Sequence, residues 1–146
     1  MRAVDTNIVV RLIVRDDARQ TTAAEKFVAK GAWVPLLALA EAVGLLGTVY
    51  ELSAKEQAAA IEMLIQHRDL VLQDSEICAA ALRLFRAKPA LGFSDCLMVE
   101  VVRKAGHTPL GTFDRDLGKV EGAVALIPIQ PVLSLGRPFR QPVPNQ

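Results

Sequence analysis

The stretch Met1-Arg2-Ala3-Val4-Asp5-Thr6-Asn7-Ile8 predicts a buried strand that ends at an aspartate and leads directly into a helix. Its first four residues form a short apolar run, which Asp5 stops abruptly. Thr6 or Asn7 can cap the helix that follows, from Ile8 to Val14. A strand that passes into a helix in this way is the repeating unit of an α/β protein.

The same alternation of apolar strands and helices continues along the chain. Strands are expected at Met1 to Val4, Ala32 to Val34, Leu70 to Leu72, Thr108 to Phe113 and Ala123 to Ile129. Helices are expected at Ile8 to Val14, Thr21 to Ala29, Leu36 to Leu52, Gln57 to His67, from a cap at Asp74 or Ser75 to Lys88, and at Asp95 to Ala105. Near-continuous apolar strands between helices argue for a mostly parallel sheet with helices on both faces.

Several residues mark where individual helices begin and end. Ser53 and Glu56 form a capping box, Ser94 is expected to cap the helix that begins next to it, and Gly106 is expected to stop that helix. Gly44 and Gly47 each weaken their helix by about 1 kcal/mol relative to alanine. We therefore expect their missing side chains to admit a close partner, such as another subunit.

Length and composition limit the class of protein. The 146 residues suit one domain with one core, which we place at residues 1–130, followed by a proline-rich arm at 131–146 that is expected to be extended or disordered. The net charge of +1 gives no general argument for a nucleic-acid partner. Cys78 and Cys96 lack metal-type spacing and are expected to be buried in a protein from a reducing compartment. With no membrane span or secretion signal evident, we expect a cytoplasmic protein without a membrane partner.

Five acidic residues lie next to apolar segments. They are Asp5, Glu41, Asp95, Asp114 and Asp116. Asp5 and Asp114 follow strands directly, and ligands of open parallel sheets bind at the carboxyl ends of the strands. Glu41 lies on a helical stripe with leucines four residues before and after it, which is expected to point inward. Two carboxylates 4 Å apart repel by about 1 kcal/mol in water and by more near protein. A hard cation, Mg²⁺ or Mn²⁺, is therefore expected among them.

Each acidic residue also has a simpler interpretation. Asp5 could cap the first helix, and Asp95 could serve the dipole of its own helix. Asp114 and Asp116 could form a turn, and Glu41 could be a snorkelling or interface residue. The metal-site interpretation depends on all of these positions together.

Motifs for other chemistries are missing from the sequence. It has no glycine-rich phosphate loop and no GxSxG elbow. Its two histidines, His67 and His107, lie at the ends of expected elements, so zinc and histidine catalysis lack ligands and bases. An all-oxygen site suits phosphodiester hydrolysis by metal-activated water.

The four acidic motifs resemble those of PIN-domain ribonucleases, specifically the VapC-type toxins of bacterial toxin–antitoxin pairs. The motifs are Val4-Asp5-Thr6-Asn7-Ile8, Glu41 in its helix, Phe93-Ser94-Asp95 and Thr112-Phe113-Asp114-Arg115-Asp116. They occur in the family's order and spacing over residues 1 to about 129. The resemblance implies an α/β/α sandwich with a mostly parallel five-stranded sheet. Glycines at 44 and 47 and a longer arm depart from the family pattern.

The resemblance also implies an activity, a site and partners. The activity is Mg²⁺- or Mn²⁺-dependent endonucleolytic cleavage of RNA. Asp5 and Asp95 would be the principal metal ligands, and Glu41 and Asp114 would complete the set directly or through water. Asp116 would act in a second layer or on a second metal. Thr112 and Asn7 would support the site, Asn7 by orienting Asp5. The partners would be RNA, a second copy of the chain and a small antitoxin that enters the acidic site, with larger assemblies reaching DNA through the antitoxin.

Cations outside the acidic floor are candidates for binding the RNA backbone. They are Arg11, Arg15, Arg83, Arg86, Lys88 and Arg115, although for any single one of them an ordinary solvated charge is the better interpretation. Two other functions stay open at this point. The chain could be a phosphatase or phospho-receiver domain, or a non-catalytic module whose acidic pocket receives an arginine-bearing peptide.

Overall fold

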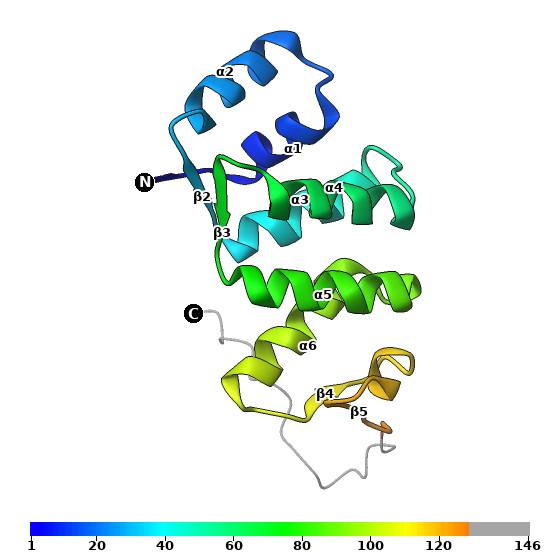
Figure 1. Ribbon diagram of the computed structural model, residues 1–146. Coiled ribbons are helices and arrows are strands. Elements are labelled where there is room, and N and C mark those ends of the chain that lie inside the picture. The colour runs from blue at the N-terminus through cyan, green and yellow to red at the C-terminus, as the bar shows by residue number, and fades with distance from the viewer. Residues whose placement is uncertain (129–146) are drawn as a thin grey trace, which may run out of the picture.

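The structure is a computed structural model that describes residues 1–128 (Figure 1). Its elements are β1 (Arg2–Ala3), α1 (Thr6–Val14), α2 (Ala18–Val28), β2 (Ala32–Val34), α3 (Leu36–Thr48), α4 (Ala54–Gln66), β3 (Leu70–Leu72), α5 (Ser75–Ala87), η1 (Pro89–Leu91), α6 (Phe93–Ala105), β4 (Leu110–Thr112), η2 (Leu117–Lys119) and β5 (Ala123–Ala125). The predicted α/β class is confirmed. The arm predicted at 131–146 and the expected strand end at Ile129 lie outside the described residues.

The paired strands are all parallel, as predicted, but they form two sheets. In the first sheet β2 lies between β1 and β3, with Trp33 opposite Ala3 on one side and Val71 on the other. In the second sheet β4 pairs with β5, with Leu110 opposite Ala123. The expected five strands are thus divided into groups of three and two. One reason is the shortness of β1, because Asp5 already turns the chain into α1 and leaves little backbone for another strand.

The core lies on one face of the three-stranded sheet. Ala32 and Val34 of β2 are buried, whereas Trp33 between them is 36% exposed, and β3 shows the same alternation. The face that carries Trp33 and Val71 is therefore partly open to solvent within residues 1–128. In the view of Figure 1, α5 and α6 lie between the first sheet and the β4–β5 pair. These two helices meet through the rings of Phe85 and Phe93, which pack edge to face at 6.0 Å.

Two helices are capped or preceded by residues other than those that the sequence predicted. Asp5 caps α1 instead of Thr6 or Asn7, since its Oδ1 accepts a hydrogen bond from the Ile8 N–H at 3.3 Å. The expected cap of α6, Ser94, lies inside the helix, and Gly92 precedes the helix instead with a φ of 81° that favours glycine. The capping box of α4 and the stop of α6 at Gly106 are confirmed.

Other boundaries shift by a few residues. The second helix begins at Ala18 rather than Thr21, because the side chain of Asp17 accepts from the Gln20 N–H. The third ends at Thr48 rather than Leu52.

The two cysteines are buried and free, as predicted. Burial raises the pKa of each thiol to about 11. Both are therefore protonated at neutral pH and act as small apolar side chains. Along residues 1–128, none of the helices combines the length and the apolar character that crossing a bilayer requires.

The capping box at the start of α4 gives a stability prediction. We expect Ser53→Ala to lower the free energy of unfolding by about 1 kcal/mol, because the Glu56 N–H loses its acceptor. Hydrogen bonds from the backbone and side chain of Ser53 lower the pKa of Glu56. The stabilisation that comes from the ionised Glu56 side chain is fully present above the ordinary glutamate pKa. It is lost as pH falls through the lowered pKa of Glu56 in the folded protein. Urea unfolding at several pH values measures both effects. Ser75→Ala, at an exposed helix start, is the control and should change little; equal losses in the two variants would contradict the prediction.

Candidate metal centre

The first part of the candidate site joins the start of α1 to α3. Asp5 stands at the carboxyl end of β1, and one of its oxygens caps α1. The hydroxyl of the next residue, Thr6, donates to Oε2 of Glu41 at 2.8 Å. Thr6 therefore orients Glu41 beside the strand end that carries Asp5. The sequence analysis treated Thr6 only as a possible cap, and its position beside Asp5 was the available signal.

The stripe of α3 that carries Glu41 points inward, as expected, only at Leu45, which is half-buried against the core. Leu37, four residues before Glu41, is 70% exposed, and Glu41 itself is exposed. Glu41 forms no ion pair within residues 1–128, so its negative charge is balanced only by the Thr6 hydroxyl and solvent. The carboxylate is thus accessible to a cation.

The second part joins α6 to the turn after β4. Asp95 is half-buried in the first turn of α6. Burial raises its pKa above the ordinary aspartate value, and the nearby negative charge of Asp114 raises it further. The structure therefore brings these two carboxylates, which are 19 residues apart in sequence, close enough to repel each other.

Asp114 is held by a turn of its own. Its Oδ1 accepts from the N–H groups of Asp116 at 2.9 Å and Leu117 at 3.0 Å, and its own N–H donates to Thr112 Oγ1 at 3.0 Å. The turn-forming interpretation of Asp114 is therefore correct. It does not exclude a metal, because a carboxylate has further acceptor sites when one oxygen is engaged. The Thr112 hydroxyl thus contacts the backbone of Asp114, and its supporting role at the site stays a prediction.

The candidate residues form the two parts described above and do not surround one common point. Among residues 1–128, no group of three or more His, Cys, Asp or Glu side chains is close enough to hold a metal ion. Asn7 makes no side-chain hydrogen bond to Asp5 in this part of the chain. The donor chemistry nevertheless fits a hard cation, since the donors are all oxygens and Asp95 has a like-charged neighbour. The ligand roles of the five acidic residues stay a prediction.

A cavity of about 280 Å³ links Asp95 to α3, with Gly44, Gly47 and Thr48 in its wall. A Cβ at Gly47 would lie 2.9 Å from Nε2 of Gln57, so Gly47 admits a side chain of α4 in the same chain. The close partner expected from the sequence, for which another subunit was one possibility, is at Gly47 a side chain of the same chain. A Cβ at Gly44 would meet no atom within 4 Å, so packing within residues 1–128 does not require this glycine.

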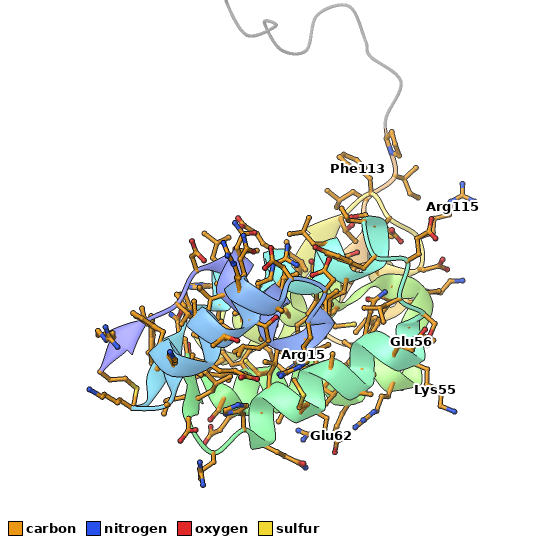
Figure 2. All side chains as sticks on the ribbon, turned by 90° about the horizontal axis from the view of Figure 1, so that it is seen from above. Arg15, Lys55, Glu56, Glu62, Phe113 and Arg115 are labelled. Carbon is orange, nitrogen blue, oxygen red and sulfur yellow. The ribbon has the colours of Figure 1, made fainter. Side chains whose placement is uncertain are left out.

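The candidate RNA-binding cations divide by their ion pairs. Arg11 pairs with Asp16, Arg15 with Glu25 and Arg86 with Glu62. Arg11 is also only 19% exposed, which leaves it poorly placed to reach a ligand. The remaining candidates, which form no ion pair within residues 1–128, are Arg83, Lys88 and Arg115. Figure 2 shows Arg115 projecting away from the body, on the same side as Phe113.

Comparison with known families identifies the fold and the class of site. The model of the PIN domain family matches residues 2–123. The chain therefore belongs to the PIN domain family, whose members are generally nucleases and typically use divalent metal ions. No curated protein matches the sequence. No solved structure matches it either.

A metal-binding prediction follows from the repulsion between Asp95 and Asp114. We expect Mn²⁺ or Mg²⁺ to raise the melting temperature of the wild type, because a ligand that binds only the folded state stabilises it. Asp95→Asn should abolish most of this rise. Without divalent ions the same variant should be slightly more stable than wild type at pH 7, and this difference should vanish as pH falls below the ordinary aspartate pKa.

Thermal melts with and without the ion, at pH 7 and at low pH, measure both expectations. Asp69→Asn, which removes only a surface pair with Arg68, is the matched control and should respond to metal as the wild type does. Equal metal responses of Asp95→Asn and the control would contradict the assignment of Asp95.

The two glycines of α3 give a second prediction. Gly44→Ala should raise the free energy of unfolding by about 1 kcal/mol, since alanine favours helix and its methyl group meets open space. Gly47→Ala should gain less, or lose stability, because its methyl group displaces Gln57, which donates to the Leu52 carbonyl at 2.9 Å. Urea unfolding of both variants measures the difference. A larger gain at 47 than at 44 would contradict the packing described above.

Proposed function

We propose that the protein is a metal-dependent endoribonuclease that acts as the toxin of a toxin–antitoxin pair. The observation that carries the proposal is the half-buried Asp95, whose pKa is raised by burial and by the charge of the turn-held Asp114, in a chain whose PIN domain spans residues 2–123. A site that concentrates carboxylates favours a divalent cation, and PIN domains as a class are nucleases.

The acidic residues have different proposed roles in binding the cation, Mg²⁺ or Mn²⁺. Asp5 and Asp95 are the proposed principal ligands, and Glu41 and Asp114 complete the set directly or through water. Asp116 contributes from the outer layer. When bound, the ion supplies polarisation of the scissile phosphate and a water of lowered pKa. Thr6 keeps Glu41 oriented, and Thr112 fixes the backbone that presents Asp114.

The proposed reaction is hydrolysis of an RNA phosphodiester by water. Water attacks phosphorus, the bond from phosphorus to O3′ breaks, and O3′ takes up a proton. The products carry a 5′-phosphate and a 3′-hydroxyl, and the 2′-hydroxyl is not the nucleophile. Selection of RNA would then come from the shape of exposed single strands or loops.

The toxin role rests on the order and spacing of the four acidic motifs. It includes a cytoplasmic location, a homodimer and a small antitoxin whose segment enters the acidic site. Uncompensated carboxylates such as Glu41 would attract an arginine of such a partner. Assemblies of toxin and antitoxin would reach DNA through the antitoxin.

The activity prediction uses the purified chain and a single-stranded RNA. We expect cleavage that needs Mg²⁺ or Mn²⁺ and that falls by on the order of 100-fold or more in Asp5→Asn and Asp95→Asn. Mapping of the RNA ends should show 5′-phosphates, and a deoxynucleotide at the cut site should still be hydrolysed. Asp69→Asn serves again as control. Cleavage that is equal in wild type and both site variants would eliminate the proposed function, and 2′,3′-cyclic phosphate ends would eliminate the water mechanism.

A further inference from the structure

A second cavity has Asp116 in its wall and shares Leu91 with the cavity that contains Asp95. It has a volume of about 320 Å³ and lies between η1 and η2. Its wall consists of Lys88, Pro89, Ala90, Leu91, Asp116 and Lys119. Two lysines and one carboxylate thus surround a largely apolar floor. This composition differs from the first cavity, whose only charged wall residue is Asp95.

In the part of the chain that the structure describes, the two lysines have no carboxylate as an ion-pair partner. Neither Lys88 nor Lys119 forms an ion pair with any of residues 1–128, although Asp116 lines the same cavity. Both side chains are exposed. The backbone of each lysine is fixed by a hydrogen bond. The Lys88 N–H donates to the Leu84 carbonyl at 2.8 Å, and the Lys119 N–H donates to the Asp116 carbonyl at 3.2 Å. The cavity therefore presents two ammonium groups, on anchored backbone, to a ligand.

The position of this cavity relates it to the carboxylate pair. Leu91 lines both cavities, so the η1 turn separates the one that contains Asp95 from the one that contains the lysines. Asp116, in the wall of the lysine cavity, follows two residues after Asp114, which acts on Asp95 electrostatically. A polyanion lying over Asp95 and Asp114 would be repelled there without a cation. Immediately beside them it would meet the two lysines.

We propose that Lys88 and Lys119 form a phosphate-binding subsite for the RNA strand next to the scissile position. The proposal rests on the proposed function and adds to it the place where the substrate backbone is held. The lysines attract a backbone phosphate adjacent to the acidic pair, and Pro89 and Leu91 give the strand a firm apolar support. Lys119 was not among the cations that the sequence analysis selected. It becomes a candidate only because the fold places it across a cavity from Lys88.

The test separates binding from cleavage. In the full chain carrying Asp95→Asn, the affinity for a fluorescent single-stranded RNA is measured by anisotropy at several salt concentrations. We expect K88Q/K119Q to weaken binding on the order of 10-fold at 0.1 M salt and to reduce the slope of log K against log salt by about 1.4, or about 0.7 per lost phosphate contact. In the otherwise wild-type chain the same double variant should raise KM with little change in kcat.

The control is K26Q/K30Q, which removes two exposed lysines at α2, at the opposite end of the molecule from β4 and β5 in Figure 1. It should bind RNA as the parent does, and circular dichroism should show both double variants folded. If K88Q/K119Q binds RNA as well as the control does, the proposed subsite is wrong. An acidic protein segment is then the better candidate for the ligand of this cavity. If the wild type cuts no RNA but binding still depends on these lysines, the nuclease proposal fails while the subsite stands.

Discussion

Electrostatic repulsion between two carboxylates that the backbone holds in place is the constraint on which the site depends. Asp95 is fixed by the start of α6, and Asp114 by the turn that its own Oδ1 stabilises. Neither has an ion-pair partner in residues 1–128, and burial of Asp95 strengthens the effect of its neighbour. Because both positions are set by hydrogen bonds of the main chain, the repulsion cannot be relieved by moving the backbone without breaking a helix start or a turn.

The other part of the site is relaxed by comparison. Asp5 has an oxygen engaged by the Ile8 N–H, and Glu41 accepts the hydroxyl of Thr6. Asp5 and Glu41 each accept one hydrogen bond there, whereas Asp114 accepts two at one oxygen and still raises the pKa of Asp95. The two parts meet through α3, which carries Glu41 one turn before Gly44 in the wall of the Asp95 cavity. The carboxylate whose pKa is raised by burial and by a charged neighbour therefore lies where α6 meets the β4–η2 turn.

The sequence predicted local features well and long-range pairings poorly. The strands at Ala32–Val34 and Leu70–Leu72 and the capping box at Ser53 depend on neighbouring residues, and the structure contains them. The pairing of β4 with β5 alone depends on how much backbone β1 offers, which an apolar run does not reveal. The cap of α6 was misassigned because a serine beside a helix is a strong signal, whereas the left-handed φ of Gly92 is a property of the folded chain. Likewise, the hydrogen bond from the Thr6 hydroxyl to Glu41 joins residues that are 35 positions apart, so the local sequence does not predict it.

The charged residues show most clearly what could not be predicted from the sequence. A net charge of +1 is a sum over the chain, and it conceals which cations are already neutralised. Arg11, Arg15 and Arg86 were reasonable candidates in the sequence, yet each has an acidic partner in the fold. An ion pair on the surface contributes little stability, but its cation must leave that partner before it can hold a phosphate. Within residues 1–128, the cations that form no ion pair, such as Lys88 and Lys119, are the ones free to meet a polyanion. In a nearly neutral protein, recognition of nucleic acid depends on this arrangement and not on the number of basic residues.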